Sequence, residues 1–72
     1  MENNKKIGEN IKNARKKLGF TQDQLTAKLQ VEGCDISRGT LAKIEVGLRD
    51  IKVTELKTLL KILKIELNDL TD

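Results

Sequence analysis

A short polar segment in the middle of this 72-residue chain carries the side chains best suited to recognising another molecule. It combines two hydroxyls, a guanidinium, an ammonium and a glycine, in the residues Ser37, Arg38, Gly39, Thr40 and Lys43. An arginine can donate two hydrogen bonds to guanine O6 and N7, and a threonine can meet a thymine methyl or another base edge. The same set could instead form an ordinary solvated helix face.

A helix that begins after Ser37 would present these groups outward. Serine is a favoured N-cap residue, and Leu41 and Ile44 recur at a spacing that turns both toward a core. The polar residues then lie on the outer face and at the N-terminal end of a helix that ends at Gly47. A recognition helix has this arrangement, because its N-terminal residues meet base edges in the major groove.

Two further helices are predicted before this one. The first is indicated by an apolar stripe at helical spacing, formed by Ile7, Ile11, Ala14 and Leu18. It is predicted to start near Asn3 or Asn4, either of which can cap it, and to stop at Gly19. The second should start at Thr21, which forms a capping box with Gln24.

Two helices are predicted after it. The first of these is indicated by apolar residues at helical spacing between Val53 and Leu63, and the second by Ile65, Leu67 and Leu70. The apolar cluster from Val53 to Ile65 is interrupted by lysines, and the N-terminus lacks the apolar run of a signal peptide. We therefore expect no membrane association and a cytoplasmic location.

The composition excludes several kinds of chemistry. With one cysteine and no histidine, a single chain can form neither a disulfide, nor a zinc ligand set, nor a histidine base. We therefore expect no metal, no cofactor and no enzymatic activity. Cys34 is flanked by Glu32 and Asp35, which oppose the low thiol pKa that redox sensing requires. We expect it to be an incidental, reduced cysteine.

An ordered set of residues resembles a known family. The set comprises Thr21, Gln22, Leu25, Leu29, Ile36, Ser37, Arg38, Leu41, Ile44, Glu45 and Gly47. It is similar to the helix-turn-helix of phage repressor and Cro proteins, the XRE family. The resemblance implies one all-α domain over residues 1–72, a lambda-repressor-like bundle of about five helices. Its helix-turn-helix would be formed by helices 2 and 3.

The resemblance also implies a function and a site. The function is sequence-specific DNA-binding transcriptional regulation, as a repressor that reads the major groove with the helix starting near Ser37. The base contacts would be Ser37, Arg38, Gly39, Thr40 and Lys43, and the phosphate contacts Gln22, Arg49 and Lys52. By the same resemblance, Gln22 would brace a recognition-helix side chain, and Arg15 would form a partly buried ion pair with Glu45.

The connection between the two helices departs from the family pattern. About five extra residues, 31–35, replace the usual short turn. The second helix is predicted to continue to Glu32 and to stop at Gly33, and Ile36 is predicted to enter the core before the next cap. The lengthened loop leaves the angle between the two helices open.

Charge and surplus apolar residues indicate the partners. Residues 1–49 carry ten Lys or Arg against six Asp or Glu, whereas residues 50–72 carry four against five. The basic excess lies on the half that contains the recognition segment, as binding to a double-stranded DNA operator requires. The apolar C-terminal residues either close the core or form a two-fold contact, and we expect a homodimer through the C-terminal helices. The alternative function is a protein-interaction module of the same fold, an antitoxin-like or bridging factor.

Overall fold

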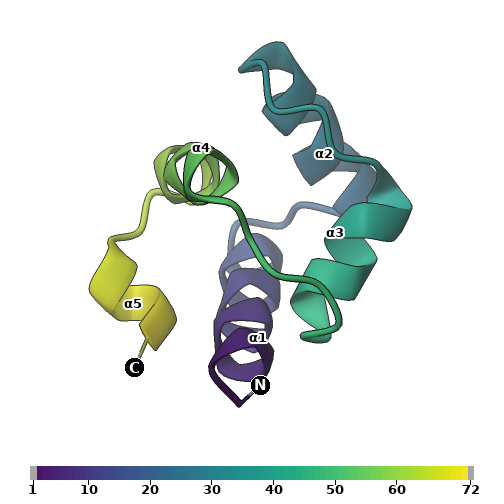
Figure 1. Ribbon diagram of the computed structural model, residues 1–72. Coiled ribbons are helices and arrows are strands. Elements are labelled where there is room, and N and C mark those ends of the chain that lie inside the picture. The colour runs from purple at the N-terminus through teal and green to yellow at the C-terminus, as the bar shows by residue number, and fades with distance from the viewer. Residues whose placement is uncertain (1, 72) are drawn as a thin grey trace.

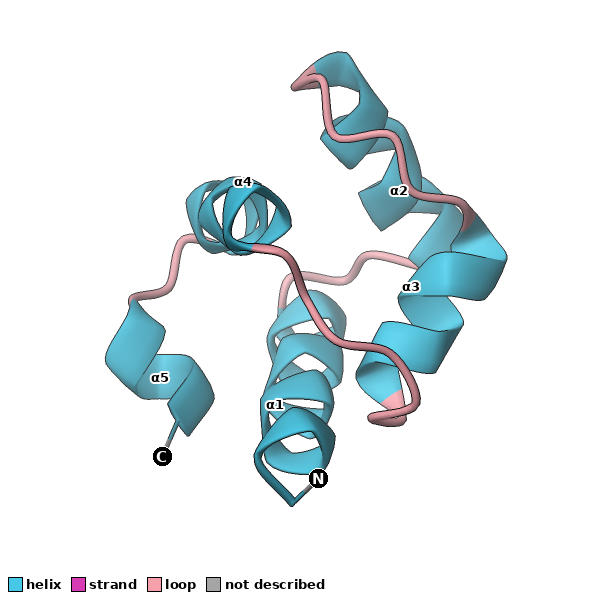
Figure 2. Ribbon diagram, in the orientation of Figure 1, coloured by secondary structure: helices cyan, strands magenta, loops and turns pink. Residues whose placement is uncertain are grey.

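Five helices make up the part of the chain that the computed structural model describes, residues 2–71, and that part contains no strand (Figure 1). The helices are α1 (Glu2–Lys17), α2 (Gln22–Val31), α3 (Arg38–Glu45), α4 (Val53–Leu63) and α5 (Leu67–Thr71). Figure 2 shows that every connection between them is a short loop or turn. The predicted all-α bundle of five helices, with α2 and α3 as the helix-turn-helix, is confirmed.

The N-terminal boundary of α1 differs from the prediction. The helix begins at Glu2, so Asn3 and Asn4 lie within it and do not cap it. The Asn4 side chain instead donates a hydrogen bond to the Asp50 carboxylate, tying α1 to the loop that precedes α4.

The C-terminal end of α1 follows the predicted glycine. Gly19 has a φ of 79°, its N–H donates to the Lys16 carbonyl at 2.9 Å, and the Phe20 N–H donates to the Arg15 carbonyl at 3.1 Å. These two bonds satisfy carbonyls that the end of the helix leaves free. Leu18, predicted to lie on the buried stripe, is 41% exposed. The helix ends at Lys17, so its periodicity no longer turns Leu18 inward.

The core is aliphatic and lies where α1 meets the other helices. α1 packs against α3, α4 and α5, and α2 packs against α3 and α4. The side chains buried most completely are Ile11, Leu25, Leu29, Leu41, Ile44, Leu59, Leu63 and Leu70. α3 is therefore held from two sides through its inner residues, and its outer face stays free.

The connection from α2 to α3 is built as predicted. α2 ends at Val31, Glu32 is its C-cap, and Gly33 follows with a φ of 85°. Ile36 is 4% exposed and belongs to the core. Cys34 is also buried, and its N–H donates to the Leu29 carbonyl at 2.8 Å. The lengthened loop is therefore anchored to the core at two points.

Candidate nucleic-acid interface

The N-terminal end of α3 is capped as the sequence predicts. Ser37 has an extended backbone, and its Oγ accepts the Thr40 N–H at 3.1 Å. The Ser37 hydroxyl also donates to Thr40 Oγ1 at 3.1 Å. Because Thr40 Oγ1 is the acceptor in that bond, its own O–H remains available to donate outward.

Inner and outer faces of α3 separate as the helical periodicity predicts. Leu41 and Ile44 are fully buried. On the other side Arg38, Gly39 and Lys43 are exposed. The structure therefore brings the five predicted base-contacting residues together at the N-terminal end and outer face of one helix. Figure 1 shows α3 at the edge of the bundle, away from α5.

Arg38 carries one of the two positive charges of this face, and Lys43 carries the other. The Arg38 side chain is 66% exposed, and its guanidinium lies 3.9 Å from the Asp23 carboxylate on α2. An ion pair this exposed is worth about 0–1 kcal/mol. The Arg38 side chain can therefore leave Asp23 for a better acceptor at little cost.

A buried ion pair fixes the C-terminal end of α3. Arg15 Nε donates to Glu45 Oε2 at 2.7 Å, and a second guanidinium nitrogen donates to Oε1 at 3.1 Å. A third donates to the Phe20 carbonyl at 2.8 Å. The side chains of Arg15 and Glu45 are only 8% and 1% exposed. The predicted pair is confirmed, and it is more deeply buried than we expected.

Gln22 extends this network to the start of α2. Its side-chain amide donates to Glu45 Oε1 at 3.0 Å. This contact confirms the predicted bracing of a recognition-helix side chain by Gln22. The amide oxygen of Gln22 is not used in that bond, and the residue is half-buried in the first turn of α2. The start of α2 and the end of α3 are thus joined through Glu45.

The loop after α3 contains a second ion pair that the sequence analysis missed. The Arg49 guanidinium donates to both carboxylate oxygens of Glu55, at 2.9 and 3.1 Å, and to the Asp50 carbonyl at 3.0 Å. Glu55 also accepts the Lys52 N–H at 3.0 Å. Lys52 and Glu55 occupy the N-cap and N3 positions of α4. Their spacing was the only sequence signal that Glu55 accepts hydrogen bonds at the start of this helix. Lys52 itself is exposed.

We predict that this second ion pair, of Arg49 with Glu55, makes the stability of the fold decrease at acidic pH. Hydrogen bonds from Arg49 hold the pKa of Glu55 below its ordinary value of 4.5, although burial opposes the shift. A lowered folded-state pKa stabilises the fold above the unfolded value, and that stability is lost as the pH falls through the folded value. Melting temperatures measured between about pH 6 and about pH 3 should fall more steeply for the wild type than for Glu55→Gln. Parallel curves would contradict this assignment.

The Cys34 thiol lies beside the same pair. Burial raises its pKa, and the nearby Glu55 carboxylate raises it further. At neutral pH the group is therefore a thiol and not the nucleophilic thiolate. Among residues 2–71 no three His, Cys, Asp or Glu side chains lie close enough together to hold a metal ion.

Residues 11–70 of this chain match the model of a helix-turn-helix family. The match covers the buried core residues from Ile11 to Leu70 and all of α2, α3 and α4. The chain belongs to the XRE-type helix-turn-helix family. No match was found among curated proteins or among solved structures.

As an XRE-type helix-turn-helix domain, the chain is a DNA-binding regulator. Its two motif helices, α2 and α3, are joined by residues 32–37, and the ion pair of Arg15 with Glu45 and its contact with Gln22 hold them in place. None of the helices described for this XRE-type domain is long and apolar enough to cross a membrane.

Proposed function

We propose that the protein is a sequence-specific transcriptional repressor that reads the major groove of an operator with α3. The observation that carries this proposal is the clustering of Ser37, Arg38, Gly39, Thr40 and Lys43 on the free face of a helix whose opposite face is fully buried. A helix held in this way can enter the groove as a rigid element, with its N-terminal end toward the bases.

Each residue of the cluster has a proposed role at the bases. Arg38 donates two hydrogen bonds to a guanine, and the free Thr40 O–H meets a neighbouring base edge. Gly39 adds no side chain at the point of closest approach to DNA. Packing within the protein does not require a glycine here, because a Cβ would meet nothing nearer than Ser37 Oγ at 3.9 Å. Lys43 lies one helical turn further and reaches a base or a phosphate. Ser37 contacts DNA from the cap position.

Phosphate contacts flank the cluster on both sides. Gln22 contributes from the first turn of α2, where free N–H groups and the helix dipole favour an anion. Lys52 contributes from the loop after α3. Arg49 contributes through the part of its guanidinium that Glu55 does not occupy, so its main effect is to position the loop.

We also propose that the operator is bound by a homodimer formed through the C-terminal helices. Leu67, at the start of α5, is 50% exposed, and Ile65 in the preceding turn is half-buried. A two-fold contact between copies would cover these side chains. Two copies of α3 would then read palindromic half-sites about 34–36 Å apart, one turn of DNA.

A gel-shift titration tests the proposed function. Duplex fragments of genomic DNA are titrated with the protein at physiological salt, against an excess of unrelated duplex. The proposal requires that one or a few fragments are retained when the rest are released. Uniform weak binding of all fragments, or none, would refute sequence-specific recognition while leaving the fold unaffected.

Replacing Arg38 with alanine is expected to relax specificity at one base pair of each half-site. The loss of a bidentate contact with guanine corresponds to about 1–3 kcal/mol of discrimination against the wrong base. Competition between the operator and single-base variants measures it. Lys57→Ala, which removes an exposed charge from α4, is the matched control and should leave the discrimination unchanged.

Replacing Lys52 with alanine should have a different signature. A phosphate contact carries no sequence information, so affinity should fall about equally for all duplexes. The slope of log affinity against log salt concentration should decrease by about 1. A slope equal to that of the wild type would remove Lys52 from the phosphate contacts. The Lys52 side chain makes no ion pair among the described residues, so the melting temperature serves as a control and should not change.

A further inference from the structure

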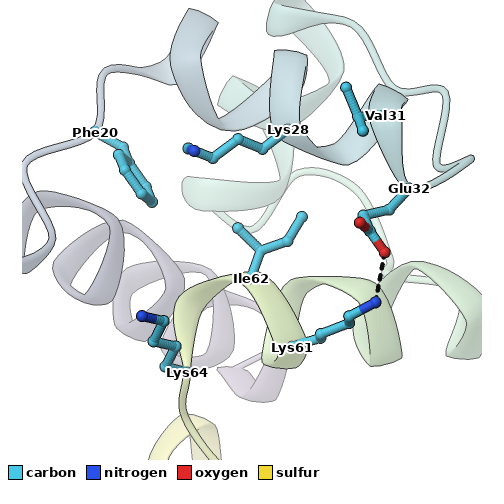
Figure 3. Close-up of a pocket in the computed structure, with 7 residues that line it drawn as sticks. All are labelled: Phe20, Lys28, Val31, Glu32, Lys61, Ile62 and Lys64. Atoms are coloured by element: carbon cyan, nitrogen blue, oxygen red, sulfur yellow. Dashed lines mark hydrogen bonds and ion pairs between the residues drawn. The ribbon is translucent and has the colours of Figure 1, made fainter.

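An open groove lies between the C-terminal parts of α2 and α4, and no residue of α3 lines it (Figure 3). We call it the α2/α4 groove. It encloses about 460 Å³, within the range of ~300–1,000 Å³ of binding pockets. Its floor is apolar, formed by Phe20, Val31 and Ile62. Val31 is 84% exposed, the highest exposure among the large apolar side chains described.

Lysines surround this apolar floor. The Lys61 ammonium lies 2.6 Å from the Glu32 carboxylate (Figure 3). Glu32 is the one acidic residue among those that line the groove. Among the described residues, Lys28 and Lys64 form no ion pair. The Lys28 ammonium lies 4.9 Å from the centre of the Phe20 ring. The groove therefore holds two cations without a bound carboxylate, next to an uncovered apolar surface.

The backbone conformation of Lys64 is a further unusual feature of the groove. Lys64 adopts a left-handed conformation with a φ of 58°, which is unfavourable for any residue with a Cβ. The other described residues with positive φ are all glycines. Glycine would suit this helix end better, so the lysine at this position costs some backbone strain. Such local strain is concentrated at functional sites, and this side chain lines the groove.

We propose that the α2/α4 groove is the docking site for an acidic, amphipathic segment of a partner protein. The segment inserts aliphatic side chains between Phe20, Val31 and Ile62, and its carboxylates bind Lys28 and Lys64. Charge complementarity selects this occupant. A nucleic-acid strand fits less well, because Lys28 already covers the face of the aromatic ring on which a base would stack. The site is separate from α3, so the proposal goes beyond the proposed DNA binding.

Selection from a displayed library of random short peptides tests this proposal, with the full chain as the immobilised target. The expected result is enrichment of peptides in which Asp or Glu flank Leu, Ile or Phe. The double variant Lys28→Glu with Lys64→Glu should bind the enriched peptides at least ~10-fold more weakly. Lys16→Glu with Lys57→Glu makes the same change of net charge at exposed sites outside the groove and should retain binding.

Lys64→Gly separates docking from folding. This change relieves the strain of the left-handed backbone conformation and removes the cation. The melting temperature should therefore stay the same or rise, while peptide affinity falls. The proposal is overturned if no acidic, apolar peptide is enriched, or if enriched peptides bind all variants equally. It is also overturned if charge reversal in the groove instead changes the oligomeric state in sedimentation, since the occupant would then be a second copy. DNA binding by the same variants is scored separately and is expected to be retained.

Discussion

Replacing Glu45 with alanine is expected to lower the free energy of unfolding by about 3–5 kcal/mol, because it leaves the buried Arg15 guanidinium without its counter-charge. The Arg15 side chain is 8% exposed, so water cannot replace the carboxylate. Two of the hydrogen bonds of Arg15 and one of Gln22 end on Glu45 and would be lost. Chemical denaturation of the purified variant measures the change. Glu9→Ala, at an exposed position of α1, is the control and should have little effect.

A double-mutant cycle shows whether the two residues act as one unit. Arg15→Ala strands the carboxylate in the same way, and removing both partners strands no charge. The double variant should therefore be much less unstable than the sum of the two single changes. Replacing both residues with apolar ones of similar volume should be close to neutral. Additive effects would show that Arg15 and Glu45 stabilise the fold independently.

The second large effect is expected at Gly8, where α1 crosses α3. A Cβ at this position would lie 2.1 Å from the Ile44 carbonyl oxygen and 2.8 Å from that of Glu45. Both atoms belong to the backbone, so relief requires the two helices to separate. We expect Gly8→Ala to cost about 3 kcal/mol or more of stability, at or beyond the upper end of overpacking effects.

Gly39→Ala adds the same methyl group on the outer face of α3 and serves as the matched control. Its Cβ would meet only Ser37 Oγ at 3.9 Å. Alanine is favoured over glycine within a helix by up to ~1 kcal/mol, so this variant should be as stable as the wild type or more so. Thermal melts of the two variants should thus move in opposite directions. If the melting temperature of Gly8→Ala equalled that of the wild type, the close approach of α1 and α3 would be wrong.

The features that could be predicted from the sequence are mostly local. Thr21 caps α2 through its hydroxyl, Ser37 caps α3, and positive-φ glycines follow α1 and α2, because each of these devices acts within a few residues. The alternation of inner and outer residues along α3 was also readable, because helical periodicity alone decides it. The pair of Arg15 and Glu45 spans 30 residues and was predicted only through the family resemblance.

The features that were missed depend on which elements meet. Gly8 is unremarkable in the sequence, and its importance arises only from the backbone of α3 lying against it. The ion pair of Arg49 with Glu55 was not predicted, because it exists only where the fold brings Glu55 within reach of the Arg49 guanidinium. The burial of Cys34 was not predicted, because it depends on the lengthened loop turning this side chain into the core. Such contacts follow from helix packing, which local sequence patterns do not specify.

The central claim is that the exposed face of α3 reads DNA sequence, and selection from a random pool of duplexes tests it most directly. The protein is incubated with the pool at physiological salt, and the retained duplexes are sequenced over successive rounds. We predict convergence on a palindromic site whose half-sites lie about one helical turn apart, with a guanine at the position assigned to Arg38. A retained pool with no sequence preference would contradict the claim.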